Sequence, residues 1–416
     1  MKKVLATGAA LLMAGSIATA AEMDDQSGVK ITGNARARVI YKDKYDFGNS
    51  DKDASTTMDS RVRFEVRGTA AGGAYIHGRI RLAEEKFNGT TSTSVDNNIY
   101  VDKAYIGVPF NDAFTLEGGK YRVSYGNGFM YDDIGLAGFR GIYDADGIRV
   151  IPFVEMQSEG QSSDVAQDVL EDNDSYRFGA ALAVTSIENW TMGAIAAYDT
   201  DDRVENQVVD GVSTATGNGN ADGFWGSIFA KGTIAEVFGL EGEFAYAENG
   251  VTLDYVQGAG TDDGYGGYVR GSWNMDALTL ALDLGFTKDG FAPDPFYGFV
   301  MIGGEEPINA VAIGANGADY VWAGLRVGYA VTEALSLTGN LVWADADSND
   351  DAAIEQTNRV YDLLEISGVL QYAVSKGCTF SWYAGYLQPD YDGRLDAAGI
   401  EDDGAFGTYA KFDVNF

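Results

Sequence analysis

The chain has 416 residues, 62 of them acidic and 29 basic, and its formal net charge of −33 excludes a nucleic-acid-binding protein, which needs a basic face. A single cysteine excludes an intramolecular disulfide framework, and 45% hydrophobic residues in regular alternation exclude an acidic disordered chain. With 54 glycines, six prolines and no low-complexity linker, the composition favours one large all-β unit over two or three soluble domains.

Residues 1–20 have the pattern of a secretory signal peptide. Two lysines precede an apolar stretch that ends in Ala-Thr-Ala, the small-residue pattern of a cleavage site. We predict cleavage after Ala20, with Ala21 as the alternative, which leaves a domain of residues 21–416 with a net charge of −35 because both lysines are lost. A membrane anchor is disfavoured because the apolar stretch is short, and no later run of about 18 apolar residues follows it. The protein is therefore expected to be exported without a membrane helix.

From Lys30 onward one unit recurs: about ten alternating residues, a tight turn, about ten more, and a longer polar loop. Val62, Phe64 and Val66 alternate with arginine and glutamate, and residues 278–286 alternate leucine or phenylalanine with smaller or polar residues. Such alternation places one face of each strand against an apolar medium and the other against water. The outward face of a soluble sandwich would instead be polar. The pattern predicts a transmembrane antiparallel β-barrel.

The connections alternate in length along the chain. We expect tight turns at residues 71–73, 111–113, 186–189, 235–237, 274–277, 331–334 and 375–377. We expect long polar loops at residues 43–58, 85–97, 200–221, 249–263, 288–318, 346–359 and 389–404. Short turns at one end and long loops at the other are the layout of bacterial outer-membrane barrels.

The strand number follows from parity. A first count gives seventeen strands, whereas a single-chain bacterial barrel has an even number. A short descending strand over residues 139–143, a turn over 144–147 with good hairpin chemistry, and an ascending strand over 147–157 raise the count to eighteen. Pro152 lacks a backbone donor and is expected to mark a bulge. Sixteen strands remain the alternative if the short hairpin belongs to a loop.

The chain ends in a strand with the same alternation. Phe406, Phe412, Val414 and Phe416 share one register, and the opposite register is mostly polar. A terminal strand normally frays, so its terminal aromatic residue indicates that the strand is held between neighbours. This ending resembles the last strand of Gram-negative outer-membrane barrels. The edge strand of a soluble sandwich is the alternative.

The connection over residues 122–138 is too apolar to extend into water. Phe129, Met130, Ile134 and Leu136 need a surface on which to pack, and folding back into the barrel supplies one. Here the chain resembles the porins, whose third extracellular loop follows the fifth strand and narrows the pore.

Two further segments carry the resemblance. Residues 114–120 resemble the fifth porin strand, and residues 100–108 resemble the fourth. The nearest layout is that of the eighteen-stranded major outer-membrane porin of the campylobacter type, in which the turn from the sixth to the seventh strand falls at residues 144–148. The resemblance implies a water-filled outer-membrane channel for passive diffusion of small hydrophilic solutes and ions, in contact with lipopolysaccharide and assembled as a homotrimer.

An inward-folded loop would carry Asp132 and Asp133 into the lumen. Seven arginines share the inward register of three adjacent strands: Arg36, Arg38, Arg61, Arg63, Arg67, Arg79 and Arg81. Acidic residues opposite a basic wall would produce a transverse field across a narrow, wet constriction and would bias the choice of ion. The alternative is that these arginines form ordinary salt bridges with Glu65, Glu84 and Glu85, or contact lipopolysaccharide near the rim.

The expected loops carry runs of acidic residues: 199–202, 262–263, 345–351 and 401–403. Residues 345–351 resemble a calcium loop but lack its glycine and closing glutamate, so no metal or other cofactor is predicted. Bridging of these loops to lipid headgroups by divalent cations is left open, beside the simpler interpretation as solvated charge. An acidic vestibule should attract cations, and we predict a weak to moderate cation preference tempered by the arginines.

No enzyme is predicted. A Ser-His-Asp hydrolase would need His77, the only histidine, and no recognisable nucleophile motif accompanies it. A substrate-specific channel is the main alternative to a general diffusion pore, and a mainly structural outer-membrane protein or adhesin is the third hypothesis.

Overall fold

The structure is a computed structural model, and it describes residues 27–45, 54–87, 99–158, 175–201, 204–209, 212–217, 223–235, 237–248, 263–294, 296–304, 306–314, 318–347, 362–390 and 403–416. The expected signal peptide lies outside these residues. Within these ranges, no helix is both long enough and apolar enough to span a membrane.

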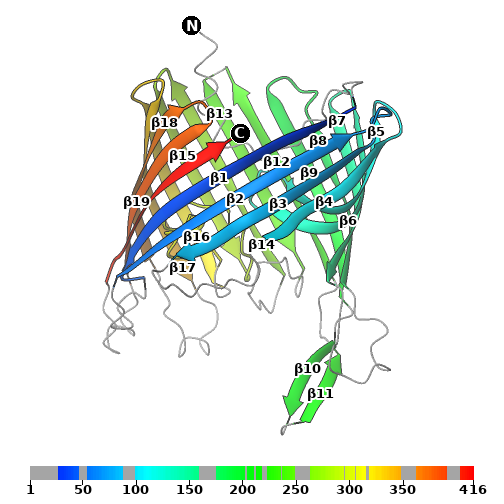
Figure 1. Ribbon diagram of the computed structural model, residues 1–416. Coiled ribbons are helices and arrows are strands. Elements are labelled where there is room, and N and C mark those ends of the chain that lie inside the picture. Colours follow the sequence, from blue (N-terminus) through cyan, green and yellow to red (C-terminus); the bar gives the residue numbers. More distant parts are fainter. Residues whose placement is uncertain are drawn as a thin grey trace.

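Eighteen antiparallel strands form one closed barrel (Figure 1). They are β1 (Gly28–Asp43), β2 (Ser55–Thr69), β3 (Tyr75–Phe87), β4 (Ile99–Pro109), β5 (Phe114–Tyr125), β6 (Tyr131–Ala145), β7 (Ile148–Ser158), β8 (Ser175–Val184), β9 (Trp190–Asp201), β12 (Gly223–Ile234), β13 (Phe238–Ala247), β14 (Gly264–Met275), β15 (Leu278–Lys288), β16 (Asp319–Ala330), β17 (Leu335–Asp347), β18 (Asp362–Ser375), β19 (Cys378–Asp390) and β20 (Ala405–Asn415). A separate hairpin, β10 (Val204–Val209) and β11 (Val212–Gly217), lies beyond the end of the barrel opposite the C-terminus (Figure 1). The predicted eighteen-stranded fold is confirmed.

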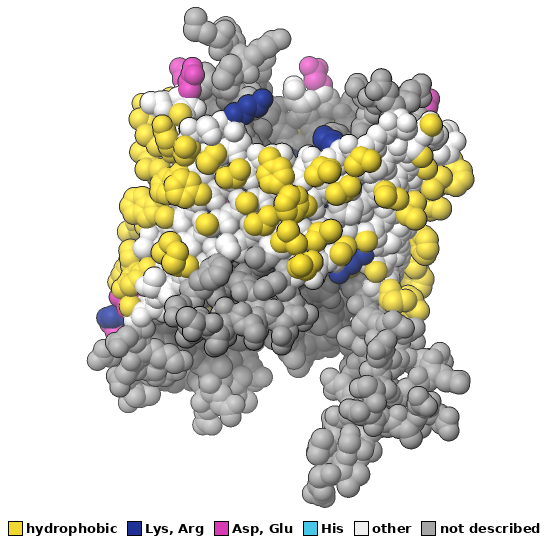
Figure 2. Space-filling view, in the orientation of Figure 1, with side chains coloured by type: hydrophobic (Ala, Val, Ile, Leu, Met, Phe, Trp, Pro, Cys, Tyr) yellow, Lys and Arg dark blue, Asp and Glu magenta, His cyan; other side chains and the backbone are white. Residues whose placement is uncertain are grey.

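The outer wall is apolar, as the alternation predicts. On β15, Leu282 and Leu284 are about half exposed, whereas Asp283 between them is buried inside. Hydrophobic side chains form a band across the face of the wall that Figure 2 shows, and the charged side chains on this face lie mostly near its two ends. Since β20 pairs with both β19 and β1, the barrel has no open edge. Closure of this kind satisfies the backbone of a sheet in lipid.

The terminal strand is held at the closure of the barrel. Backbone hydrogen bonds join Gly33 and Phe416 in both directions, at 2.8 and 3.0 Å. The ring of Phe416 packs against Phe64 and covers Gly33, where an added Cβ would lie 2.4 Å from the ring. The expectation that the last residue is locked between neighbours is confirmed.

Two predictions about the sixth and seventh strands need correction. The turn at residues 144–147 is present, and Asp146 and Gly147 adopt the positive φ values that a tight hairpin turn requires. However, β6 is not a short strand, because it already begins at Tyr131. Pro152 marks no bulge, since the pairs on either side of it keep one register between β6 and β7.

The largest correction concerns residues 288–318, which the sequence analysis placed among the polar outer loops. Within the described part of this segment, Phe291, Met301 and Ile308 are buried. Gly314 lies directly against the backbone of Phe291 and Ala292, so the ends of the segment adjoin, as in an Ω-loop. We call residues 291–314 the inner segment.

Candidate pore constriction

The β5–β6 hairpin reaches through the lumen to a separate part of the barrel wall. Its tip, residues 126–130, contacts β12 and β13, which lie four and five positions beyond β6 around the barrel. The side-chain amide of Asn127 donates to the carbonyls of Ala230 at 3.1 Å and Gly242 at 2.9 Å. Phe129 and Met130 are almost fully buried. The expected inward fold is therefore present, although it is built as an extended hairpin with a short tip instead of a long irregular loop.

The inner segment crosses the lumen from β15 toward β18, β20 and the end of β1. The hydroxyl of Tyr45 donates to the carbonyl of Ile308, and the hydroxyl of Tyr409 donates to Glu306. Ile308 also packs on Gly407, where a Cβ would lie 2.7 Å from its side chain. Glycine at this position of β20 lets the segment approach the wall closely.

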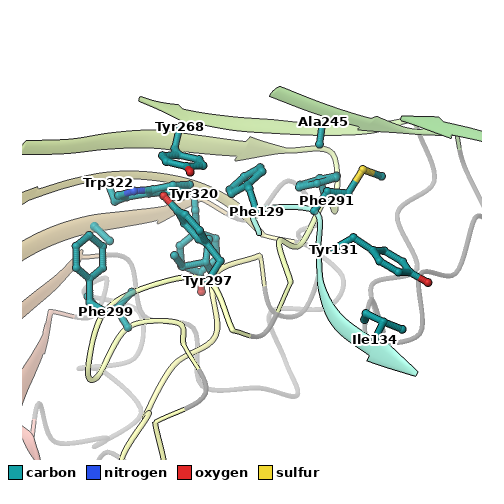
Figure 3. Packing of buried hydrophobic residues seen from close by; sticks show 14 of the residues in the cluster. Phe129, Tyr131, Ile134, Ala245, Tyr268, Phe291, Tyr297, Phe299, Tyr320 and Trp322 are labelled. Atoms are coloured by element: carbon teal, nitrogen blue, oxygen red, sulfur yellow. The ribbon is translucent and has the colours of Figure 1, made fainter. Parts of the chain in front are cut away.

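The hairpin and the inner segment meet in an aromatic cluster (Figure 3). Phe129 packs edge-on against Tyr297 at 4.8 Å and stacks on Phe291 at 5.7 Å. The backbone amide of Asp294 donates to the carbonyl of Phe129 at 2.7 Å. Burial, together with the carboxylate of Asp283, holds the pKa of Tyr297 well above its usual value, so this hydroxyl stays protonated.

A buried group of charged residues lies on strands β8 and β9 of the barrel wall. Arg177 on β8 donates two hydrogen bonds of 2.7 Å to Asp199 on β9, and Trp225 donates to the same carboxylate at 2.9 Å. Tyr131 of the hairpin stacks on Trp225 with ring centroids 5.6 Å apart and nearly parallel planes. Asp199, expected among the solvated loop acids, is instead a buried partner of an arginine.

The predicted arginines line the inner face of β1, β2 and β3. Their neighbours in the opposite register, such as Val39 and Ile76, are exposed on the outer wall. Arg38 binds Asp59 through Nε at 2.9 Å and through its terminal nitrogen at 2.8 Å, and Arg36 approaches the same carboxylate at 3.8 Å. Arg67 lies over the ring of Tyr75 at 4.1 Å. We call the seven arginines the arginine wall.

A bulge supplies the second acidic partner of the arginine wall. Arg79 pairs with Lys103 and the next residue, Ile80, pairs with Val101, so Asp102 is the extra residue of β4. Its buried carboxylate accepts from Arg79 at 2.8 and 2.7 Å and from Arg81 at 2.5 Å. Simple alternation hides this placement, and the sequence analysis missed both Asp59 and Asp102.

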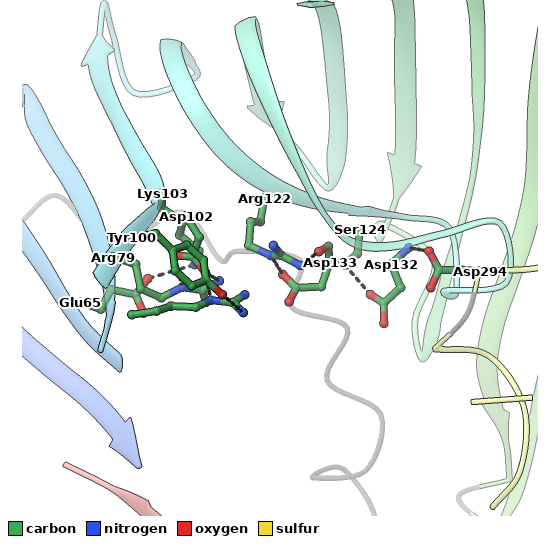
Figure 4. A network of polar contacts seen from close by, with 11 residues as sticks. Glu65, Arg79, Tyr100, Asp102, Lys103, Arg122, Ser124, Asp132, Asp133 and Asp294 are labelled. Carbon is green, nitrogen blue, oxygen red and sulfur yellow. Dashed lines mark hydrogen bonds and ion pairs between the residues drawn. The ribbon is translucent and has the colours of Figure 1, made fainter. Parts of the chain in front are cut away.

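Asp132 and Asp133 lie at the base of the hairpin tip, on the lumen side of β6 (Figure 4). Asp133 pairs with Arg122 at 2.6 Å, and its side chain is 43% exposed. Asp132 accepts from the hydroxyl of Ser124, and its amide donates to Asp294 at 2.9 Å. Figure 4 shows this group opposite the cluster of Glu65, Arg79 and Asp102. Arg122 and Ser124 are partners that the sequence analysis did not name.

The alternative salt-bridge partners are only partly described. Glu65 lies 2.6 Å from His77 Nε2 and 2.9 Å from Lys103 Nζ. The other ring nitrogen of His77 lies 2.9 Å from the hydroxyl of Tyr105. The side chains of Glu84 and Glu85 lie outside the described residues. Glu65 thus contacts both His77 and Lys103, and it lies opposite Arg79 of the arginine wall in the pairing of β2 and β3.

Among the described residues, no three His, Cys, Asp or Glu side chains are placed to hold a metal ion. Half of the acidic residues in the four predicted loop runs lie outside that part of the chain: Asp202, Asp262, Asp350, Asp351, Glu401 and Asp402. One that is described, Asp403, pairs with Lys44 at 2.9 Å.

Comparisons with known proteins agree with the barrel fold. No curated protein matches the chain at a significant level. Among solved structures, a BenF-like porin from Pseudomonas fluorescens Pf-5 is similar, with a TM-score of 0.59 and 9% identity over 93% of this chain and 98% of that chain. OccAB4 of Acinetobacter baumannii has a TM-score of 0.58 and 12% identity over 94% and 100%. OccK2 of Pseudomonas aeruginosa, solved in complex with glucuronate, has a TM-score of 0.54 and 10% identity over 93% and 98%.

These identities establish a shared fold and no more. A family model for Gram-negative porins, however, matches residues 6–352, most of the chain. The chain therefore belongs to the Gram-negative porin family and is an integral β-barrel of the bacterial outer membrane.

Proposed function

We propose that the protein forms a water-filled channel for passive diffusion of small hydrophilic solutes and ions. One observation supports the proposal above others. The β5–β6 hairpin and the inner segment fold into the lumen, where the arginine wall and the partly exposed Asp133 provide charged inner surfaces. Charged groups opposite one another in a narrow aqueous passage favour polar solutes over apolar ones. The test is single-channel recording of the purified protein in planar bilayers.

A weak cation preference is part of the proposal. The net charge of −33 should concentrate cations near the mouths at low salt, whereas the arginine wall opposes this inside. Reversal potentials across a KCl gradient measure the balance. Anion selectivity would show that the arginine wall outweighs the acidic vestibule.

A substrate-specific channel is the second candidate, and the arginine wall favours it. Arg36 and Arg38 share the carboxylate of Asp59, and Arg79 and Arg81 share that of Asp102, so guanidinium groups from adjacent strands gather on one side of the lumen, where they favour a small anionic solute. Guanidinium groups bind carboxylates through paired hydrogen bonds. A specific channel would show current block by low concentrations of one solute, whereas a general pore would show none.

The remaining assignments are also proposals. A homotrimer in contact with lipopolysaccharide, the campylobacter-type layout and the absence of enzymatic activity agree with family membership. For the acidic loops we propose solvated charge, with bridging by divalent cations as the alternative. A mainly structural protein or adhesin would give no channel currents in the same recordings.

A further inference from the structure

Two buried glutamates on the barrel wall hold backbone amides of the two inward elements. Glu243 on β13 is 3% exposed, and Glu365 on β18 is fully buried. Both point inward from strands far apart in the barrel order, and each receives more than one amide N–H from the turn that it contacts.

Glu243 receives the tip of the β5–β6 hairpin. Its Oε2 atom accepts from the amides of Asn127 at 2.7 Å and Phe129 at 3.2 Å. Gly126 and Gly128 adopt positive φ values on either side of Asn127, which lets alternate amides converge on one acceptor. A Cβ on Gly126 would lie 2.4 Å from Oε1 of Glu243, so the tip fits the carboxylate closely.

Glu365 receives the inner segment in the same way. It accepts from the consecutive amides of Val300, Met301 and Ile302 at 3.2, 3.0 and 2.9 Å. Ser367 donates to the carboxylate at 2.6 Å. A fully buried carboxylate that accepts from three amides is hard to replace, because a neutral amide side chain offers only one acceptor oxygen and points an N–H group at the other N–H donors.

The two docked elements also support one another. The amide of Asp132 on the hairpin donates to Asp294 of the inner segment, and the amide of Asp294 donates back to the carbonyl of Phe129. Phe129 is fully buried among Phe291 and Tyr297 of the inner segment. Each carboxylate therefore holds its own element directly and the other element through this contact.

We propose that Glu243 and Glu365 are positioning residues of the pore, and that they hold the hairpin and the inner segment as one interlocked constriction. This inference rests on the proposed channel function for its effect on conductance, but not for the anchoring itself. Loss of either carboxylate loosens its element while the other still braces it, and loss of both releases the constriction.

The experiment compares the full-length protein with Glu243→Gln, Glu365→Gln and the double variant. Glu241→Gln is the matched control, because Glu241 lies two residues from Glu243 on the same face, is 6% exposed, and binds the wall side chains Arg270 and Lys231. The altered electrophoretic mobility of the unheated barrel shows that each variant is folded. Limited chymotrypsin digestion then reports whether the aromatic residues of the inner segment have become accessible, and planar bilayers report conductance and the size of excluded neutral polymers.

We expect cleavage within the inner segment of Glu365→Gln, together with higher conductance and passage of larger polymers. The fold-increase in conductance of the double variant should be about twice the product of the fold-increases of the two single variants, since the effects of coupled residues are not additive. Glu241→Gln should match the parent protein in cleavage and in polymer exclusion. Folded Glu365→Gln that resists the protease like the parent, or a double variant that equals the product of the singles, overturns the interlocked anchoring.

A second variant serves if Glu365→Gln does not fold. Deletion of residues 293–313 joins Ala292 to Gly314, which already adjoin. It removes nearly all of the inner segment and changes no residue of the barrel strands. Unchanged conductance in this variant counts against the inference, and a rise supports it. If the parent protein does not conduct, the channel function fails while the protease result still decides the anchoring.

Discussion

Asp102 offers the sharpest test of how the arginine wall is held. Replacement by asparagine keeps the size of the side chain and removes one negative charge from a carboxylate that is 4% exposed. Three hydrogen bonds from Arg79 and Arg81 end on this carboxylate. Breaking a buried pair by neutralising one partner costs about 3–5 kcal/mol, and the nearby lumen water moves the expectation to about 3 kcal/mol of unfolding free energy.

The same change alters the field in the lumen. A unit charge about 6 Å from a passing ion is worth about 0.7 kcal/mol in a medium with the dielectric constant of water. Screening at about 0.1 M salt halves this to about 0.4 kcal/mol. Cations lose that attraction and anions gain it, so the cation-to-anion permeability ratio should fall about fourfold in Asp102→Asn.

Reversal potentials in a KCl gradient measure this shift, and Asp112→Asn is the control. Asp112 is exposed in the turn between β4 and β5, so the control removes the same charge outside the lumen. The control should change neither the permeability ratio nor the unfolding free energy by a comparable amount. Equal shifts in both variants, or an unchanged ratio in a folded Asp102→Asn protein, would refute the placement of Asp102 within the conducting path.

Three further predictions follow from the described contacts. Gly33→Ala should lower the unfolding free energy by about 1–3 kcal/mol because its Cβ meets the ring of Phe416, whereas Gly72→Ala, with open space around it, should leave stability unchanged, and heat-shift electrophoresis compares the two. Arg177→Met should lower the unfolding free energy by about 3–5 kcal/mol because Asp199 is left buried without its main partner, and a smaller effect than that of Arg67→Met in urea titrations would contradict this. Arg122→Gln and Asp133→Asn should shift the reversal potential in opposite directions, toward cations and toward anions respectively, and shifts of the same sign would show that this pair does not face the pore.

The barrel itself could be predicted because residues that face lipid and residues that face the lumen alternate along each strand. Alternating residues such as Leu282 and Leu284 report the lipid face directly, and closure of the sheet made parity a usable constraint. The turn at Asp146 and Gly147 followed from that constraint. The apolar tip at Phe129 and Met130 followed from the cost of exposing such residues to water.

The rest depends on features that alternation does not encode. The bulge at Asp102 shifts a side chain between faces without any change in composition. The inner segment carried a usable signal, the apolar run of residues 296–302, but it was interpreted from its position between strands as another outer loop. Glu243 and Glu365 were missed because their partners are backbone amides, which no side-chain pattern reveals.

The most direct test of the account is single-channel recording of the purified, folded protein in planar bilayers. The account predicts discrete conductance steps, with a pore narrowed well below the width of an eighteen-stranded barrel and widened by deletion of residues 293–313. If electrophoretic mobility shows that the protein is folded and it still gives no conductance steps, that result would contradict a channel function. Conductance that the deletion leaves unchanged would contradict the constriction described here.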